Sequence, residues 1–268
     1  MYVTRTLESF IGTAGKQFPV LLVTGARQVG KTTFLQHLCK KERAYVTLDD
    51  PLILSLAKED PALFLQRFPP PVFIYEIQYA PELLPYIKME VDRNKQPDQF
   101  WLTGSQQFHL MKRVSESLAG RLEMIEMDGF DLSEIGQKQA SRLWLRGGFP
   151  LSFLAKNDAD SFTWGKSLIQ AFLERDLRQQ GIDIPAVSLH RFWIMLANSH
   201  GRIWNAAPFA SSLGISEPTV RRYLDILTGV FMVRQIQPWH ANIKKRQVKA
   251  PKVYVRDTGV LHSLLGLK

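Results

Sequence analysis

The sequence predicts an α/β fold, in which a parallel sheet with helices on both faces precedes a mainly helical region. Short apolar runs alternate with helical patterns through the first half of the 268-residue chain, which is typical of parallel βαβ units. A Gly-Gly-Phe-Pro turn at 147–150 ends this alternation, and residues 160–228 are mostly helical in pattern. We therefore expect two domains, 1–150 and 151–268, with the boundary within 147–160.

Each expected element has a local reason in the sequence. The expected strands are short apolar runs that each end before a glycine or an acidic residue, namely 20–24, 45–48, 72–75 and 100–103. The expected helices have apolar residues at helical spacing, namely 31–40, 52–68 and 83–93. Pro61 is expected to break the second of these helices, because proline lacks the amide hydrogen that a helix interior requires.

Composition excludes several classes of protein. The chain has no run of about 18 apolar residues, which a membrane-spanning helix needs. Residues 1–19 lack an apolar stretch followed by a cleavage site, so no secretory signal is expected. The lone cysteine, Cys39, cannot form an internal disulfide, which favours a reducing compartment. We therefore expect a cytoplasmic protein with no membrane partner.

The strongest motif is a phosphate-binding loop at residues 25–32, Gly-Ala-Arg-Gln-Val-Gly-Lys-Thr. It matches G-x-x-x-x-G-K-[ST] in full and lies between an expected strand and an expected helix, the context that the motif requires. Backbone amides of such a loop bind phosphates, the lysine reaches the β- and γ-phosphates, and the threonine hydroxyl binds Mg²⁺. The expected nucleotide-binding residues are Gly25, Ala26, Arg27, Gln28, Val29, Gly30, Lys31, Thr32 and Thr33.

The acidic element that should accompany this loop is altered. In phosphate-loop enzymes a neighbouring strand typically ends in Asp, which holds Mg²⁺ directly or through water. Here the run 72–75 ends in Tyr75, which occupies the Asp position, and Glu76 follows. A tyrosine is neutral near pH 7 and is not the anionic oxygen ligand that Mg²⁺ prefers.

Three interpretations of Tyr75 stay open. In the first, which we favour, the loop still binds nucleotide while hydrolysis is slow or lost. Alternatively, Asp49 or Asp50, at the end of another expected strand, takes over the metal-binding role. The third interpretation is that Tyr75 is a sequence variant of an active parent.

Together with the loop, several further motifs resemble a family of prokaryotic predicted AAA-type ATPases that carry a poorly characterised C-terminal region. The resemblance covers nearly the whole chain and rests on an ordered set of motifs: Glu76-Ile-Gln78, Leu102-Thr-Gly-Ser105, Ser117-Leu-Ala-Gly-Arg121, Gly147-Gly-Phe-Pro150, Glu174-Arg-Asp176 and Lys252-Val-Tyr-Val-Arg-Asp-Thr-Gly259. The family has Asp where this chain has Tyr75. It also continues well beyond residues 257–259, so this chain looks C-terminally shortened and nuclease-like activity is not expected.

The resemblance implies an AAA-type fold with ATP and Mg²⁺ as ligands. In such enzymes the acidic pair includes a glutamate that polarises the attacking water, here Glu76. A polar sensor residue follows the next strand, and Thr103 or Ser105 fits that role. An arginine from the same chain or from a neighbouring chain stabilises the transition state. Arg121 is a better candidate for this arginine than Arg175 is. Sites between subunits are common in these enzymes, which implies a homo-oligomer.

The segment 206–228 predicts a helix-turn-helix. A short helix ends at Gly214, and a second begins after Ser216, with Pro218 in its first turn. The start of the second helix is where a recognition helix contacts DNA. The expected contacts there are Thr219, Arg221, Arg222 and Tyr223.

Two further strands are expected to complete a winged helix, with the wing at about 230–256. The loop between them holds a basic cluster that includes Lys244, Lys245 and Arg246. Residues 151–268 contain 16 Lys and Arg against 8 Asp and Glu, whereas residues 1–150 contain 18 against 17. A basic half of this kind indicates a polyanion such as DNA as partner, although winged helices also serve for packing alone.

Three functions follow from these patterns. The first is an ATP-dependent switch that acts with DNA. The second is a non-hydrolysing nucleotide-binding regulator or protein-interaction module. The third is a DNA-binding regulator with a vestigial ATPase core.

Overall fold

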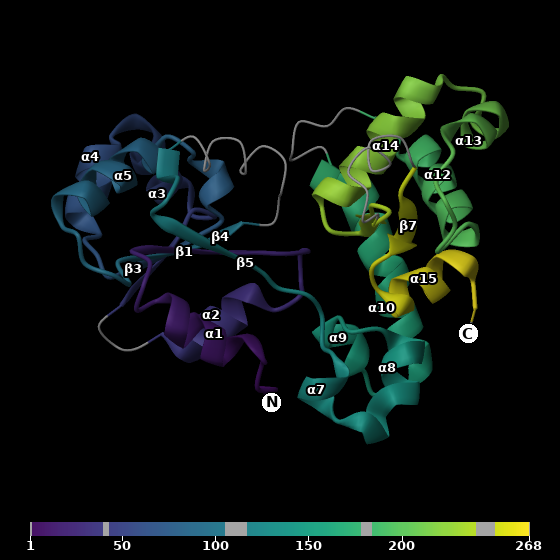
Figure 1. Ribbon diagram of the computed structural model, residues 1–268, viewed down its shortest axis with the longest axis horizontal. Coiled ribbons are helices and arrows are strands. Elements are labelled where there is room, and N and C mark those ends of the chain that lie inside the picture. The colour runs from purple at the N-terminus through teal and green to yellow at the C-terminus, as the bar shows by residue number, and fades with distance from the viewer. Residues whose placement is uncertain (1, 40–42, 105–116, 178–183, 240–249, 268) are drawn as a thin grey trace. The chain divides into compact units, whose positions relative to one another are not determined.

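The computed structural model describes residues 2–39, 43–104, 117–177, 184–239 and 250–267. The chain forms two compact units, Met1–Asp128 and Gly129–Lys268 (Figure 1). Within the described ranges, none of the helices is both long and apolar enough to cross a membrane.

The first unit contains a five-stranded parallel sheet in the order β2-β3-β4-β1-β5. The strands are β1 (Val20–Thr24), β2 (Ala44–Thr47), β3 (Val72–Tyr75), β4 (Phe100–Gly104) and β5 (Leu122–Glu126). The predicted parallel α/β sheet is confirmed. The order places β4 between β1 and β3, so that the ends of these three strands are neighbours along one edge.

Helices cover both faces of this sheet (Figure 1). One face carries α1 (Leu7–Ala14) and α2 (Lys31–Leu38), and the other carries α3 (Pro51–Glu59), α4 (Pro61–Arg67) and α5 (Leu83–Arg93). Alternate strand residues such as Leu22 and Ile74 pack against buried Phe64 and Ile87 from the second set of helices. The predicted break at Pro61 separates α3 from α4, and a short 3₁₀ turn, η1 (Ile77–Tyr79), follows β3.

The second unit is mainly helical. It contains α7 (Leu132–Ile135), η2 (Gln137–Gln139), α8 (Ala140–Arg146), α9 (Pro150–Phe153), α10 (Asp158–Ala171), the π-helical turn η3 (Phe172–Asp176), α12 (Ala186–Asn198), α13 (Ala206–Leu213), α14 (Glu217–Gly229), β6 (Val233–Ile236), β7 (Lys252–Val255) and α15 (Thr258–Leu265). Strands β6 and β7 pair in antiparallel fashion.

The division between the units falls earlier than residues 147–160, where the sequence suggested it. The amide of Phe130 donates a 2.6 Å hydrogen bond to the carbonyl oxygen of Gly148. A Cβ atom on Gly129 would collide with the backbone of Gly148. Residues 129–150 add no strand to the sheet, and their helices α8 and α9 contact α10. This segment therefore belongs with the second unit.

Two motifs that lie far apart in the sequence meet in this unit. The Asp257 carboxylate accepts hydrogen bonds from the amides of Gly148 (2.7 Å) and Val260 (2.9 Å). Gly147 has a positive φ of 75°, and a Cβ atom there would overlap the Asp257 carboxylate. Asp257 thus joins the 147–150 turn to the start of α15.

The core of α12, α13 and α14 is aromatic. The Phe192 ring contacts the rings of Trp204, Phe209 and Tyr223 at centroid distances of 6.0, 5.6 and 5.7 Å. Gly214 adopts the left-handed conformation that ends α13, and Ser216 caps α14 by accepting from the Thr219 amide. The predicted succession of helix, turn and helix over 206–228 is therefore present.

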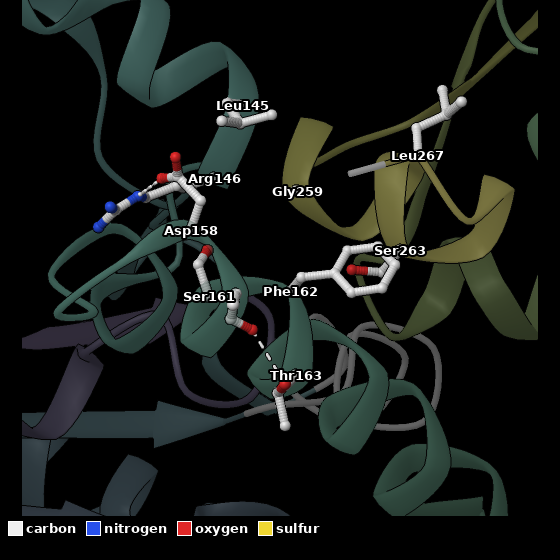
Figure 2. A pocket seen from close by; sticks show the side chains of 10 residues that line it. Leu145, Arg146, Asp158, Ser161, Phe162, Thr163, Gly259, Ser263 and Leu267 are labelled. Atoms are coloured by element: carbon white, nitrogen blue, oxygen red, sulfur yellow. Dashed lines mark hydrogen bonds and ion pairs between the residues drawn. The ribbon is translucent and has the colours of Figure 1, made fainter.

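A cavity of about 220 Å³ lies among α8, α10 and α15 (Figure 2). Arg146 from α8 and Asp158 from α10 form an ion pair of 2.6 Å at its wall. The guanidinium of Arg146 also donates to the carbonyl oxygens of Phe153 and Ala155. Through these bonds Arg146 holds the segment between α8 and α10 in place.

Candidate nucleotide-binding site

The phosphate loop connects β1 to α2 at the carboxyl edge of the sheet. Gly25 has φ 142° and Gly30 has φ 98°, a region that glycine enters without strain. A side chain on Gly25 would collide with the carbonyl oxygen of Met127. The two glycines of the motif are therefore required by the backbone path.

The amino end of α2 points its amides toward the loop. Gly30 is the N-cap residue and offers no side chain to accept from them, and the Gly30 carbonyl accepts the first intrahelical bond from Phe34. Uncapped amides at a helix N-terminus, together with the helix dipole, form an anion-binding site.

Lys31 lies within the loop, and only 5% of its surface is exposed. Its ammonium group donates to the carbonyl oxygens of Gly25 and Ala26, each at 2.9 Å. Burial lowers the pKa of Lys31 to about 8, although the charge of Glu76 opposes that shift. The buried ammonium is therefore held where a bound phosphate would reach it.

Glu76 follows β3 in the left-handed region, with φ 60° and ψ 54°, and it is buried. Its amide donates a 3.0 Å hydrogen bond to the hydroxyl of Thr103 at the end of β4. Its carboxylate accepts from the side-chain amide of Gln78. The structure thus brings together the two candidates Glu76 and Thr103, whereas Ser105 lies outside the described residues.

Tyr75 is the last residue of β3 and is half-buried. Burial raises the pKa of the Tyr75 hydroxyl, and the neighbouring charge of Glu76 raises it further. The phenol is therefore neutral across the physiological range of pH. It stands at the strand end where the sequence motif has its acidic residue.

The donor groups at this edge do not form the usual Mg²⁺ site. Thr32 supplies one hydroxyl, but Tyr75 at the end of β3 supplies no anionic oxygen. Asp50 caps α3 by accepting from the amides of Leu52 (2.8 Å) and Ile53 (3.4 Å). Asp49 is exposed as a residue, but partial desolvation of its carboxyl, together with the charge of Glu76, raises its pKa. The described part of the chain contains no cluster of three or more His, Cys, Asp or Glu residues that could hold a metal ion.

The sequence left open whether Arg121 acts on the phosphates of its own chain or of a neighbouring chain, and the structure bears on the first alternative. The Arg121 carbonyl accepts from the amide of Val20, the first residue of β1, whereas the phosphate loop follows the last residue of that strand. Its guanidinium forms an ion pair with Asp92, at 2.5 and 3.1 Å. Arg121 therefore lies at the edge of the sheet opposite the phosphate loop of its own chain, and its action on a neighbouring chain stays a prediction.

Sequence reasoning missed Arg5, which braces the phosphate loop. Arg5 is buried, with 5% of its surface exposed, and donates to the carbonyl oxygens of Val29 (3.3 Å) and Asp128 (2.7 Å). Tyr2, in the same segment, stacks on His37 of α2 with the ring centroids 3.8 Å apart. No motif marks these residues, because their partners lie 24 or more positions away in the chain.

The candidate DNA-contacting residues divide into three groups. Arg221 and Arg222 are exposed on α14, where Arg221 pairs with Glu217 at 3.3 Å, and Thr219 is half-buried. Tyr223 was expected to be exposed but is buried against Phe192, so its ring cannot contact DNA. The wing residues lie outside the described residues, namely Lys244, Lys245 and Arg246.

The sheet order, the loop between β1 and α2, and the polar strand ends beside it define a P-loop NTPase fold of the AAA type. Comparison with known proteins agrees with this class. Residues 17–136 match a family model described as an AAA domain. Residues 137–268 match a domain of unknown function, DUF8612.

Two curated relatives are similar over most of this chain. They are "Uncharacterized protein Mb2031c" of Mycobacterium bovis and "Uncharacterized protein Rv2008c" of Mycobacterium tuberculosis. Each is 46% identical over 250 residues, which cover 93% of this chain and 56% of the relative. The chain thus spans little more than half the length of these relatives.

Two solved structures align along most of the chain, but weakly. "Structure of Drosophila ORC bound to DNA" has a TM-score of 0.32 and 12% identity, covering 96% of this chain and 84% of that one. "Structure of Drosophila ORC bound to AT-rich DNA and Cdc6" has a TM-score of 0.26 and 10% identity, covering 96% and 89%. Similarity at this level carries no argument about function.

Proposed function

We propose that the chain binds ATP at the phosphate loop and hydrolyses it slowly or not at all. One observation carries this proposal: a complete loop, with its lysine buried between loop carbonyls, follows β1 at the same sheet edge where β3 ends in Tyr75. The loop supplies amides and a cation for the phosphates. The missing carboxylate removes a group on which phosphoryl transfer normally depends.

Calorimetric titration with ATP tests the binding step. The unmodified chain is expected to bind, and Lys31→Ala to lose most of that affinity because a neutral side chain replaces the buried cation. At 100 times the dissociation constant, the ligand should add about 2.7 kcal/mol to the free energy of unfolding. The absence of any binding would support a vestigial core instead.

A second proposed function is DNA binding through a winged helix formed by α13, α14 and the β6–β7 pair. Arg222 is exposed on α14. Arg234 on β6 and Lys252 on β7 are exposed, and the antiparallel register places both on the same face. The basic loop of residues 240–249 connects these two strands in the sequence, which favours contact with phosphates.

If both activities are present, the chain acts as a nucleotide-dependent switch. Fluorescence anisotropy with a labelled duplex tests this, because ATP should then change the affinity for DNA. If ATP does not change the affinity for DNA, the two activities are independent of each other. A chain that binds ATP but no DNA would fit the alternative, a protein-interaction module regulated by nucleotide.

A further inference from the structure

We propose that Arg5 transmits nucleotide binding at the phosphate loop to residues 128–130, where the chain passes from the first unit into the second. This inference rests on the proposed nucleotide binding and adds to it how that site is regulated. Because linked equilibria are reciprocal, a change at this connection would in turn alter the affinity for nucleotide. Arg5 is then a positioning residue that makes the connection sensitive to nucleotide.

The first support is that Arg5 binds both of the segments that it is proposed to link. Its Nη1 donates to the carbonyl oxygen of Val29, within the loop, at 3.3 Å. Its Nη2 donates to the carbonyl oxygen of Asp128, the last residue of the first unit, at 2.7 Å. One planar guanidinium therefore fixes the loop and the connection relative to each other.

The second support is that Arg5 is itself firmly held. Its backbone amide donates to Glu8 Oε1 at 3.0 Å, and the hydroxyl of Tyr2 donates to the same oxygen at 2.9 Å. The ring of Tyr2 is stacked on His37 of α2. A buried side chain that is anchored in this way transmits a displacement instead of absorbing it, because a close-packed interior is barely compressible.

The third support is that phosphate binding gives the loop a reason to change. The ammonium of Lys31 has three hydrogens to donate, and it donates to the carbonyl oxygens of Gly25 and Ala26. A phosphate oxygen is charged and accepts a stronger hydrogen bond than a neutral carbonyl does. A bound phosphate therefore draws Lys31 away from these carbonyls and alters the forces on the loop that Arg5 holds at Val29.

Beyond the connection, the chain is fixed to the 147–150 turn of the second unit. The Phe130 amide donates to the Gly148 carbonyl at 2.6 Å, and a Cβ atom on Gly129 would lie 2.6 Å from the same residue. The Gly148 amide in turn donates to the Asp257 carboxylate, which caps α15. A shift of the connection is therefore passed on to the start of α15.

A competing path does not involve Arg5. The loop begins against the residue that precedes the connection, since a Cβ atom on Gly25 would lie 2.2 Å from the carbonyl oxygen of Met127. The loop can therefore act on Met127 directly. The experiment must read residues 128–130 and 147–149 separately from Met127, and it must compare chains with and without the guanidinium of Arg5.

Arg43 provides a matched control within the first unit. Its side chain is also buried, with 6% of its surface exposed, and it donates to the carbonyl oxygens of Asp98 and Gln99. These two residues precede β4, whereas the phosphate loop follows the end of β1, the parallel neighbour of β4. Arg43→Gln therefore removes comparable hydrogen bonds at the opposite edge of the sheet.

Hydrogen–deuterium exchange with and without saturating ATP tests the inference. In the unmodified chain, ATP should slow exchange in the loop, residues 25–32, and also at residues 128–130 and 147–149, by about fivefold or more. In Arg5→Gln, with ATP raised to saturation, the loop should still be protected while the effect at the other two segments falls below about twofold. Arg43→Gln should respond as the unmodified chain does. Thermal unfolding of each variant checks that it is folded.

Different failures have different meanings. If ATP does not protect the loop of the unmodified chain at any concentration, the proposed function itself fails, and the inference falls with it. If ATP protects the loop but not residues 128–130, the inference is overturned while nucleotide binding stands. Equal protection of residues 128–130 with and without the guanidinium also overturns it, and assigns the coupling to Met127.

If Arg5→Gln does not fold, Arg5→Lys decides the question. It keeps the positive charge but replaces the two separate nitrogens that donate to Val29 and Asp128 with one. The effect of ATP on residues 128–130 should then be clearly smaller than in the unmodified chain. An undiminished effect would overturn the inference.

Discussion

Lys31 is the residue on which nucleotide binding depends most directly. Its ammonium lies between two loop carbonyls and is almost fully buried. Burial disfavours the charged form, so the pKa of this lysine, about 8, is far below its ordinary value. The cation is retained at neutral pH because the carbonyls and the charge of Glu76 stabilise it.

This lowered pKa predicts that ATP affinity depends on pH. Below about pH 8 Lys31 is charged in the unliganded chain. At higher pH, binding must first protonate it, so the dissociation constant should rise by up to about tenfold per pH unit. Titrations between pH 7 and pH 10 measure this rise. Lys31→Arg stays charged throughout and should show a flat profile; a matching rise in that variant would assign the effect to another group.

Arg5 gives a second prediction at this scale. Its guanidinium holds the carbonyl of Val29 inside the phosphate loop, so Arg5→Gln should weaken ATP binding by loosening the loop. Arg5→Lys keeps one charged donor and should recover part of the affinity. Titration of both variants, with unfolding curves beside them, measures the effect. Equal affinity in all three proteins would show that Arg5 only stabilises the fold.

Among the elements, α14 shows how an amphipathic helix separates a core from a surface. Val220, Tyr223, Leu224 and Leu227 are buried, whereas Arg221, Arg222 and Asp225 are exposed. Tyr223 was expected among the exposed residues, because it lies near the start of the second helix, where a recognition helix contacts DNA. The Phe192 ring of α12, which no local pattern connects to α14, decides its position.

Substitutions at neighbouring positions of α14 test this division. Tyr223→Ala removes a ring from the aromatic core and should lower the free energy of unfolding by about 3 to 5 kcal/mol. Arg222→Ala, one residue earlier and exposed, should change it by less than about 0.5 kcal/mol. Urea unfolding of the two variants makes the comparison. A small loss in Tyr223→Ala would contradict the packing described for this core.

Local patterns predicted the phosphate loop, strands β1 to β4 and helices α2 to α5 of the first unit, because strand runs, helix caps and the loop motif involve residues close in sequence. They did not predict α1 or β5. Features that depend on distant partners could not be predicted. The ion pair of Arg121 with Asp92 spans 29 positions, and the bond from Arg5 to Asp128 spans 123. The boundary between the units was displaced for the same reason, because Gly148 pairs with Phe130 rather than starting a new unit.

At the scale of the whole molecule, positive charge is concentrated in the second half of the sequence. The structure describes only part of that charge, including exposed Arg222, Arg234 and Lys252. An extended basic surface should bind DNA with a strong dependence on salt, because counterions are released from the phosphates.

Arg222 allows this prediction to be measured. If it contacts a phosphate, Arg222→Ala should weaken binding to all duplexes alike and reduce the slope of log K against log salt by about 1. Anisotropy titrations over a range of salt concentrations give the slope. Arg175→Ala is a control, because this arginine pairs with Asp176 outside the helix-turn-helix. An unchanged slope in Arg222→Ala would remove α14 from the DNA interface.

The most direct test of the central claim is ATP turnover at saturating ATP and Mg²⁺ by the unmodified chain, Tyr75→Asp and Lys31→Ala. The account predicts little or no turnover by the unmodified chain, a gain in Tyr75→Asp, and none in Lys31→Ala. Turnover by the unmodified chain at an ordinary rate of about 1 s⁻¹ or more, abolished in Lys31→Ala, would contradict it. That result would mean that another carboxylate has replaced the missing aspartate.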